Sequence, residues 1–156
     1  MTQREKLGAT LAECRLHAEV LDDALAEMNT LHFTAETVAG LTKIQRRLLD
    51  QLAYRFAKLQ DTLGEKVLPG LVELAEEPLP ENATFAEKLQ RLERLGAVES
   101  AAGWRELREL RNQIAHEYID QPALKAAALN RFLQGVGQLI VFWRQAETFA
   151  KTHLSQ

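Results

Sequence analysis

The chain has 156 residues, a formal net charge of −3 and one cysteine, Cys14. A chain of this length buries a core without metals or disulfides, so its size gives no reason to expect a structural cofactor. No apolar run approaches the roughly 20 residues that span a bilayer, and the first residues lack the apolar stretch of a secretory signal. The sequence therefore predicts one domain over residues 1–156, outside the membrane, and the lone cysteine agrees with the reducing cytoplasm. Because the net charge is negative, any nucleic-acid contact must be confined to a local site, and DNA is not an expected partner.

The apolar residues repeat with a helical period almost throughout the chain. One apolar seam runs along residues 7–28, a second along residues 41–63, and the most apolar seam along residues 129–149. The helix of the second seam is expected to end near Pro69, with a short piece continuing to Leu74, because proline lacks a backbone donor and clashes with the preceding turn. Residues 76–82 are acidic and proline-bearing, which predicts a loop.

Capping signals predict where the remaining helices begin and end. Thr84 to Glu87 fits a capping box, and the short helix that follows should stop at Gly96. Ser100 is expected to cap a fourth helix, and Pro122 to break the chain or to open the last helix. Together these signals predict an all-α fold, an up-and-down antiparallel bundle of four long helices plus a short fifth helix.

Most enzyme classes lack their usual sequence signal in this chain, which has no glycine-rich phosphate loop, no paired-cysteine motif and no nucleophile elbow. Of the four histidines, His17 and His32 are read as having no carboxylate or cysteine partner at ligand spacing, and His153 is expected in a frayed tail. We therefore predict no metal site and no cofactor, and we interpret these three histidines as structural.

The remaining polar segment runs from Arg111 to Tyr118 and has the form R-N-x-x-A-H-x-Y. Chance would place an arginine, a histidine and a tyrosine at this spacing about 0.004 times in a chain of this composition. On a straight helix Arg111 and His116 diverge by about 140°. The side chains therefore meet in one pocket only if the helix bends or ends near residues 115–116, or if a second copy approaches across a twofold axis.

This segment resembles the signature of the HEPN family, and more closely that of its HepT-like toxins, R-x-x-x-x-H-x-Y at the end of a bundle helix. Arg111, His116 and Tyr118 match it position by position, and Asn112 matches the common family form. Residues 54–64 also look like the family, so the resemblance covers about residues 36–145. The helix before it carries no motif and is expected only to complete the bundle or the dimer.

The resemblance implies a metal-independent endoribonuclease, the toxin of a toxin–antitoxin pair, that cleaves RNA as a homodimer. Its usual partner is a minimal nucleotidyltransferase antitoxin, which in some members adenylylates the motif tyrosine, here Tyr118. The residue types suit this chemistry, because a histidine titrates near neutral pH and a guanidinium presents forked donors to phosphate. His116 is thus the expected acid and base, Arg111 the phosphate ligand, and a pair of each in a dimer would complete the site.

Each residue also has a structural interpretation when taken alone. Arg111 could belong to a solvated ion-pair face, His116 could cap a helix, and Tyr118 could pack in the core. Asn112 is interpreted as a positioning partner of His116. Outside the motif, Arg55 and Asp61 are predicted to support the site residues. Arg55 lies on the apolar side of its helix and should pair with a carboxylate or face the site. Two other functions stay open, a non-catalytic nucleotide-binding subunit of a nucleotidyltransferase and a structural helical adaptor.

Overall fold

The computed structural model of the chain describes residues 1–28, 32–76, 79–113 and 120–155. The regular elements in these ranges are all helices, and the ranges contain no strand. None of these helices is both long enough and apolar enough to cross a membrane. In chain order the elements are α1 (Gln3–Glu27), α2 (Ala35–Ala39), α3 (Lys43–Thr62), a π-helical turn (Leu63–Val67), α4 (Leu68–Leu74), α5 (Phe85–Leu95), α6 (Ala101–Gln113) and α7 (Pro122–Leu154). The all-α prediction is confirmed.

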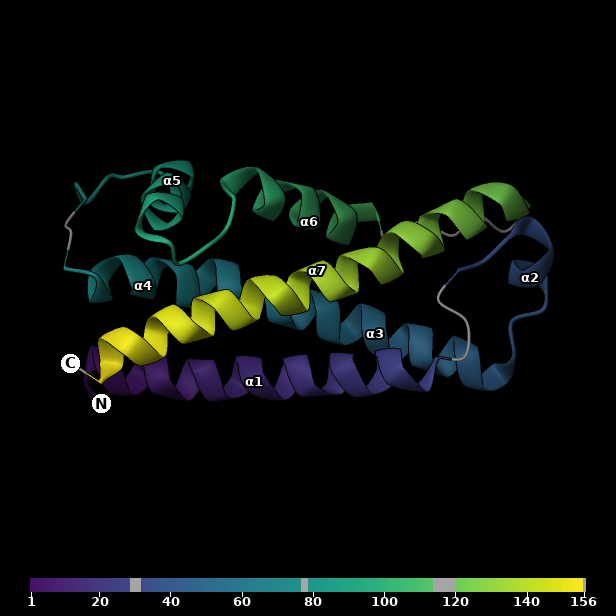
Figure 1. Ribbon diagram of the computed structural model, residues 1–156, viewed down its shortest axis with the longest axis horizontal. Helices are drawn as coiled ribbons and strands as arrows, with labels where there is room; N and C mark the ends of the chain where they lie inside the picture. The colour runs from purple at the N-terminus through teal and green to yellow at the C-terminus, as the bar shows by residue number, and fades with distance from the viewer. Residues whose placement is uncertain (29–31, 77–78, 114–119, 156) are drawn as a thin grey trace.

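The long helices lie side by side and alternate in direction (Figure 1). Helix α1 runs away from the end where both termini lie, α3 returns along it, α6 runs out again on the other side of α3, and α7 comes back to the starting end. The termini are tied together, because Arg4 Nη2 lies 2.9 Å from the carbonyl oxygens of both His153 and Leu154 and donates to them. These contacts order the end of α7, so the expected frayed tail at His153 is wrong.

The predicted seams form one core between α1, α3 and α7. From the first seam Leu11, Cys14 and Leu21 are buried, and from the last seam Val136 and Leu139 are. The second seam is buried from residue 48 onward, whereas Ile44, in the first turn of α3, is 67% exposed. Burial of these side chains supplies most of the driving force for folding, at about 25 cal/mol per Å² of apolar surface.

Pro69 does not end the second helix, contrary to the prediction, whereas the predicted short helical piece up to Leu74 is present as α4. The chain passes from α3 through the π-helical turn into α4, where Pro69 lies in the first turn. In the wider turn Leu68 donates to the carbonyl of Leu63, five residues earlier. The widened turn changes the spacing of the backbone carbonyls before Pro69, which would otherwise clash with the proline ring. The missing backbone donor is tolerated because Pro69 lies in the first turn of α4. The helical path therefore continues to Leu74.

The predicted caps of the shorter helices are largely present. The Thr84 hydroxyl accepts from the Glu87 N–H at 3.1 Å, while Glu87 Oε1 accepts from that same hydroxyl at 3.2 Å rather than from the Thr84 backbone, so the capping box is only half formed. Gly96 ends α5 with a φ of 81°, a left-handed conformation that glycine adopts without strain. The Ser100 hydroxyl accepts from the Gly103 N–H at 3.0 Å, and Pro122 opens α7. Helix α2 was not predicted.

Candidate functional site

Helix α6 carries the start of the motif and is held firmly against its neighbours. Trp104 is buried and packs over the π-helical turn, where a Cβ added to Gly64 would lie 3.0 Å from Trp104 Cζ2. On α7, Gly135 makes room for the side chain of Leu110, which occupies the place that a Cβ would take. Two glycines thus let α6 come close to both helices, and Leu110, the residue just before Arg111, is fixed against α7.

Arg111 makes a forked ion pair with Asp61 of α3. Its Nε donates to Asp61 Oδ1 at 3.1 Å and its Nη2 donates to Oδ2 at 3.0 Å. The two side chains are 34% and 36% exposed, so water and a dissolved ligand can reach them. Because α6 is antiparallel to α3, Trp104 meets Gly64 at one end of the contact and Arg111 meets Asp61 at the other. The structure therefore brings together two of the candidate residues that are 50 positions apart in the chain.

This pair can orient a phosphate group. A guanidinium has five N–H donors, and within the described part of the chain two of them are used by Asp61. The carboxylate fixes the plane of the fork and lowers its net charge, so Arg111 is an oriented donor rather than a free cation. The remaining donors suit phosphate oxygens.

The other motif residues are only partly described. Asn112 follows Arg111 on α6 and is exposed. His116 and Tyr118 lie outside the described residues, and so does the expected bend or end of the motif helix at residues 115–116. The structure thus places Arg111, Asn112 and Asp61, and the convergence of all four motif side chains stays a prediction.

Arg55 belongs to a different contact, and among the described residues its side-chain partner is a histidine of α1 rather than one of the two expected alternatives, a carboxylate or the site. Its Nη1 lies 3.0 Å from Nδ1 of His17, a buried side chain of α1. Because arginine can only donate, His17 Nδ1 accepts, and the imidazole proton then lies on Nε2. Burial lowers the pKa of His17 below its ordinary value, and the Arg55 charge lowers that pKa further. Arg55 thus satisfies Nδ1 of a neutral histidine between α1 and α3, whereas Nε2 is buried without a hydrogen-bond partner among the described residues.

A carboxylate lies near His17, although none was expected from the sequence. Glu13, one helical turn earlier, brings its Oε1 to 3.6 Å from His17 Nε2. This spacing is too long for a hydrogen bond and gives a single carboxylate, and the described residues contain no group of side chains that could hold a metal ion. Burial raises the pKa of the neighbouring Cys14 thiol to about 12, so this cysteine stays protonated.

Sequence reasoning missed Gln60, which precedes Asp61 on α3. Its side chain is fully buried, and neither amide atom has a hydrogen-bond partner among the described residues. A buried amide in this state costs roughly 1–3 kcal/mol. The signal was present in the sequence, because Gln60 is four residues after Phe56 and shares its apolar side of the helix. A polar group therefore lies on the inner side of α3, next to the residue that holds Arg111.

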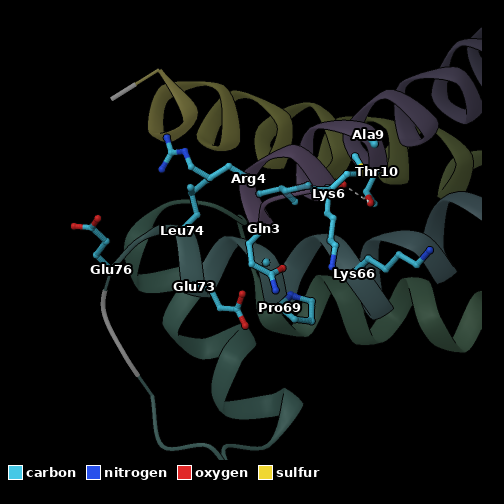
Figure 2. A pocket seen from close by; sticks show the side chains of 13 residues that line it. Gln3, Arg4, Lys6, Ala9, Thr10, Lys66, Pro69, Glu73, Leu74 and Glu76 are labelled. Carbon is cyan, nitrogen blue, oxygen red and sulfur yellow. Dashed lines mark hydrogen bonds between the residues drawn. The ribbon is translucent and has the colours of Figure 1, made fainter.

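Among the described residues, two of the hollows on the surface are lined by side chains other than Arg111 and Asp61. The larger of these hollows has a volume of about 590 Å³ and lies between the start of α1 and α4. Its lining includes Lys6, Lys66 and Glu73. Figure 2 shows these side chains around a mixed-charge opening, with Arg4 turned toward the chain terminus. The second, about 550 Å³, lies between α6 and α7 beside Gly137. The forked pair itself is about one third exposed.

Comparison with known proteins does not extend this description. Neither a protein-family model, nor a curated protein, nor a solved structure matches the chain. The resemblance to the HEPN family accordingly rests on the residues themselves, Arg111, Asn112, His116 and Tyr118, with the stretch 54–64 on α3 and its continuation.

Proposed function

We propose that this chain is a metal-independent endoribonuclease that works as a homodimer. The observation that carries the proposal is the forked pair of Arg111 and Asp61 at the end of α6, directly before the segment that contains His116. A guanidinium held in a fixed plane at a solvent-reachable position suits a phosphate oxygen. A histidine five residues later supplies a group that titrates near neutral pH. Together they are the groups needed to cleave RNA without a metal.

The reaction is a transesterification at phosphorus. One His116 takes the proton of the ribose 2′-hydroxyl, and the 2′-oxygen forms a bond to phosphorus while the bond from phosphorus to the 5′-oxygen breaks. A second, protonated His116 gives its proton to the leaving 5′-oxygen, so the products are a 2′,3′-cyclic phosphate and a 5′-hydroxyl. Arg111 donates to the phosphate oxygens, on which negative charge increases in the transition state.

This chemistry requires two copies of the chain. One histidine cannot act as base and acid in the same step. Two of the other histidines are engaged in contacts of their own. His17 bonds to Arg55, and His153 Nδ1 lies 3.0 Å from the carbonyl of Phe149. Two His116 and two Arg111 side chains meeting across a twofold axis would complete the site.

The direct test replaces the histidine. His116→Ala is expected to abolish cleavage of single-stranded RNA while the thermal unfolding curve stays the same, and His32→Ala, which removes an exposed histidine elsewhere, is the matched control. An RNA with a 2′-deoxyribose at the cut position should resist the wild-type protein. Full activity of His116→Ala, or normal cutting of the deoxy substrate, would exclude this mechanism.

A nucleotidyltransferase partner is the regulatory part of the proposal. Adenylylation of Tyr118 would add a bulky anion two residues from His116 and repel the RNA backbone. Incubation with such a partner and ATP should add one adenylate to the chain by mass spectrometry, and Tyr118→Phe should prevent it. An unchanged mass with an active partner would count against the modification.

A second candidate function is favoured by the Asp61 carboxylate. Because the pair carries no net charge, it could hold a nucleotide for a partner enzyme without cleaving anything. Expression of the chain with and without a minimal nucleotidyltransferase separates the two functions. Growth arrest that depends on His116 supports the nuclease, whereas nucleotide binding with no arrest supports the binding subunit.

A further inference from the structure

Helix α3 is basic although the protein as a whole is acidic. It carries five lysine or arginine residues and two aspartates, in a chain whose formal net charge is −3. Lys43, Arg47 and Lys58 are exposed, and one of the two aspartates, Asp61, is already paired with Arg111. Positive charge is therefore concentrated on the helix that contacts the candidate site.

An exposed aromatic ring lies within this basic surface. Tyr54 is 57% exposed, and both Arg55 Cζ and Lys58 Nζ lie 5.6 Å from the centroid of its ring. Cations at this distance interact with the π system and restrict the motion of the side chain. A large ring held in place at the surface is a platform on which a nucleic-acid base can stack.

These side chains share one face of α3. At 100° per residue, Lys43, Arg47, Tyr54, Lys58 and Asp61 fall within about 60° of one another. Asp50, which is exposed, lies about 20° from Lys43 on the same face, between Arg47 and Tyr54 along the axis. From Lys43 to Asp61 this face is roughly 27 Å long. It ends at the carboxylate that holds Arg111, so a strand lying along it would be led to the forked pair.

We propose that the α3 strip, defined as Lys43, Arg47, Tyr54 and Lys58, binds single-stranded RNA and guides it to Arg111. One base stacks on Tyr54, and the phosphates on either side contact Lys58 and Arg47. The proposal deepens the nuclease function and rests on it for the choice of RNA. The three cations outnumber Asp50, so the strip is net positive, and with its aromatic ring it complements a polyanion with stacking bases.

The experiment measures binding rather than cleavage. A fluorescein-labelled oligouridylate with 2′-O-methyl groups cannot be cut by 2′-hydroxyl attack, and its anisotropy reports the dissociation constant. Tyr54→Ala should weaken binding about tenfold, and Tyr54→Phe, which keeps the ring, should restore it. Lys58→Ala should weaken binding severalfold and reduce the slope of log affinity against log salt by about 0.7. Lys151→Ala removes an exposed lysine of α7 and should leave both quantities unchanged.

The outcomes separate this proposal from the nuclease. If the wild-type chain binds through the strip and cleaves nothing, the strip stands and the nuclease falls. If RNA is cleaved with dependence on His116 while Tyr54→Ala and Lys58→Ala leave the dissociation constant and KM unchanged, the strip is wrong. A change of oligomeric state in Tyr54→Ala with no change in RNA affinity would also overturn it, because the face would then be an interface between copies.

Discussion

Within the described part of the chain, side chains of α3 make two polar contacts with neighbouring helices, and the contacts differ in how much water reaches them. Toward α1, Arg55 donates to the buried imidazole of His17. Toward α6, Asp61 accepts both bonds of the Arg111 fork, and both partners are about one third exposed. The first contact gives the buried Nδ1 of His17 a donor, whereas the second leaves N–H donors of Arg111 available to a ligand. The same helix thus carries a structural pair and a pair suited to binding.

The largest expected effect tests the open pair. Arg111→Ala removes the donors proposed to stabilise the transition state and should lower the RNA cleavage rate about 100- to 1000-fold. The free energy of unfolding should change little, because exposed ion pairs contribute at most about 1 kcal/mol. Single-turnover cleavage and chemical denaturation measure the two quantities. Arg108→Ala, an exposed arginine of the same helix, is the control, and equal rates for the two variants would remove Arg111 from the mechanism.

Arg55→Met should give the opposite pattern. It leaves the buried Nδ1 of His17 without its donor, which should lower the free energy of unfolding by about 1–3 kcal/mol. Cleavage by the folded fraction should fall far less than in Arg111→Ala. Urea denaturation followed by circular dichroism gives the stability, with Arg47→Met, an exposed arginine of α3, as the reference. A variant as stable as that reference would show that the contact contributes nothing to the fold.

Asp61→Asn should have a moderate effect and separates orientation from charge. The amide keeps the shape of the side chain but cannot accept both bonds of the fork, so Arg111 loses its fixed plane. We expect kcat to fall about tenfold while KM stays equal or decreases, because the freed guanidinium attracts phosphate more strongly. Steady-state kinetics on a fluorogenic RNA give both constants. A rise in KM with unchanged kcat would mean that Asp61 does not position Arg111.

The smallest effect is a pH dependence of stability. The pKa of His17 is lowered in the folded chain, mainly by burial, so the unfolded chain takes up the proton first as the pH falls below the ordinary value of 6.5. The stability present above that pH is therefore lost progressively as the pH falls toward the folded pKa. Melting temperatures between pH 7.5 and pH 5 should drop more for the wild type than for His17→Gln. Parallel curves for both proteins would contradict this assignment.

The helices could be predicted from the sequence because burial follows a period of 3.6 residues. Leu52, Phe56 and Leu59 are all fully buried where the seam placed them. Ile44 follows the same seam but is exposed, because periodicity does not tell where a neighbouring helix ceases to cover it. Pro69 was misjudged because the rule for proline is local, whereas the π-helical turn before it is not encoded in any short signal.

The candidate site could be predicted only in part. The R-x-x-x-x-H-x-Y spacing marks Arg111, but its partner Asp61 depends on the register between α3 and α6, which no local pattern contains. For the same reason the partner of Arg55 turned out to be His17 of α1 rather than a carboxylate. Long-range pairing is set by how helices pack, and a sequence pattern along one helix does not report it.

The central claim is that two copies of His116 act in one shared site, and mixing subunits tests it most directly. Wild-type chain and His116→Ala chain are mixed in increasing ratio, left to exchange subunits, and assayed for RNA cleavage at constant total protein. If each site needs both histidines, activity should fall with the square of the wild-type fraction, because only dimers of two wild-type chains cleave. A linear fall would mean that each chain cleaves alone, and the shared site would be wrong.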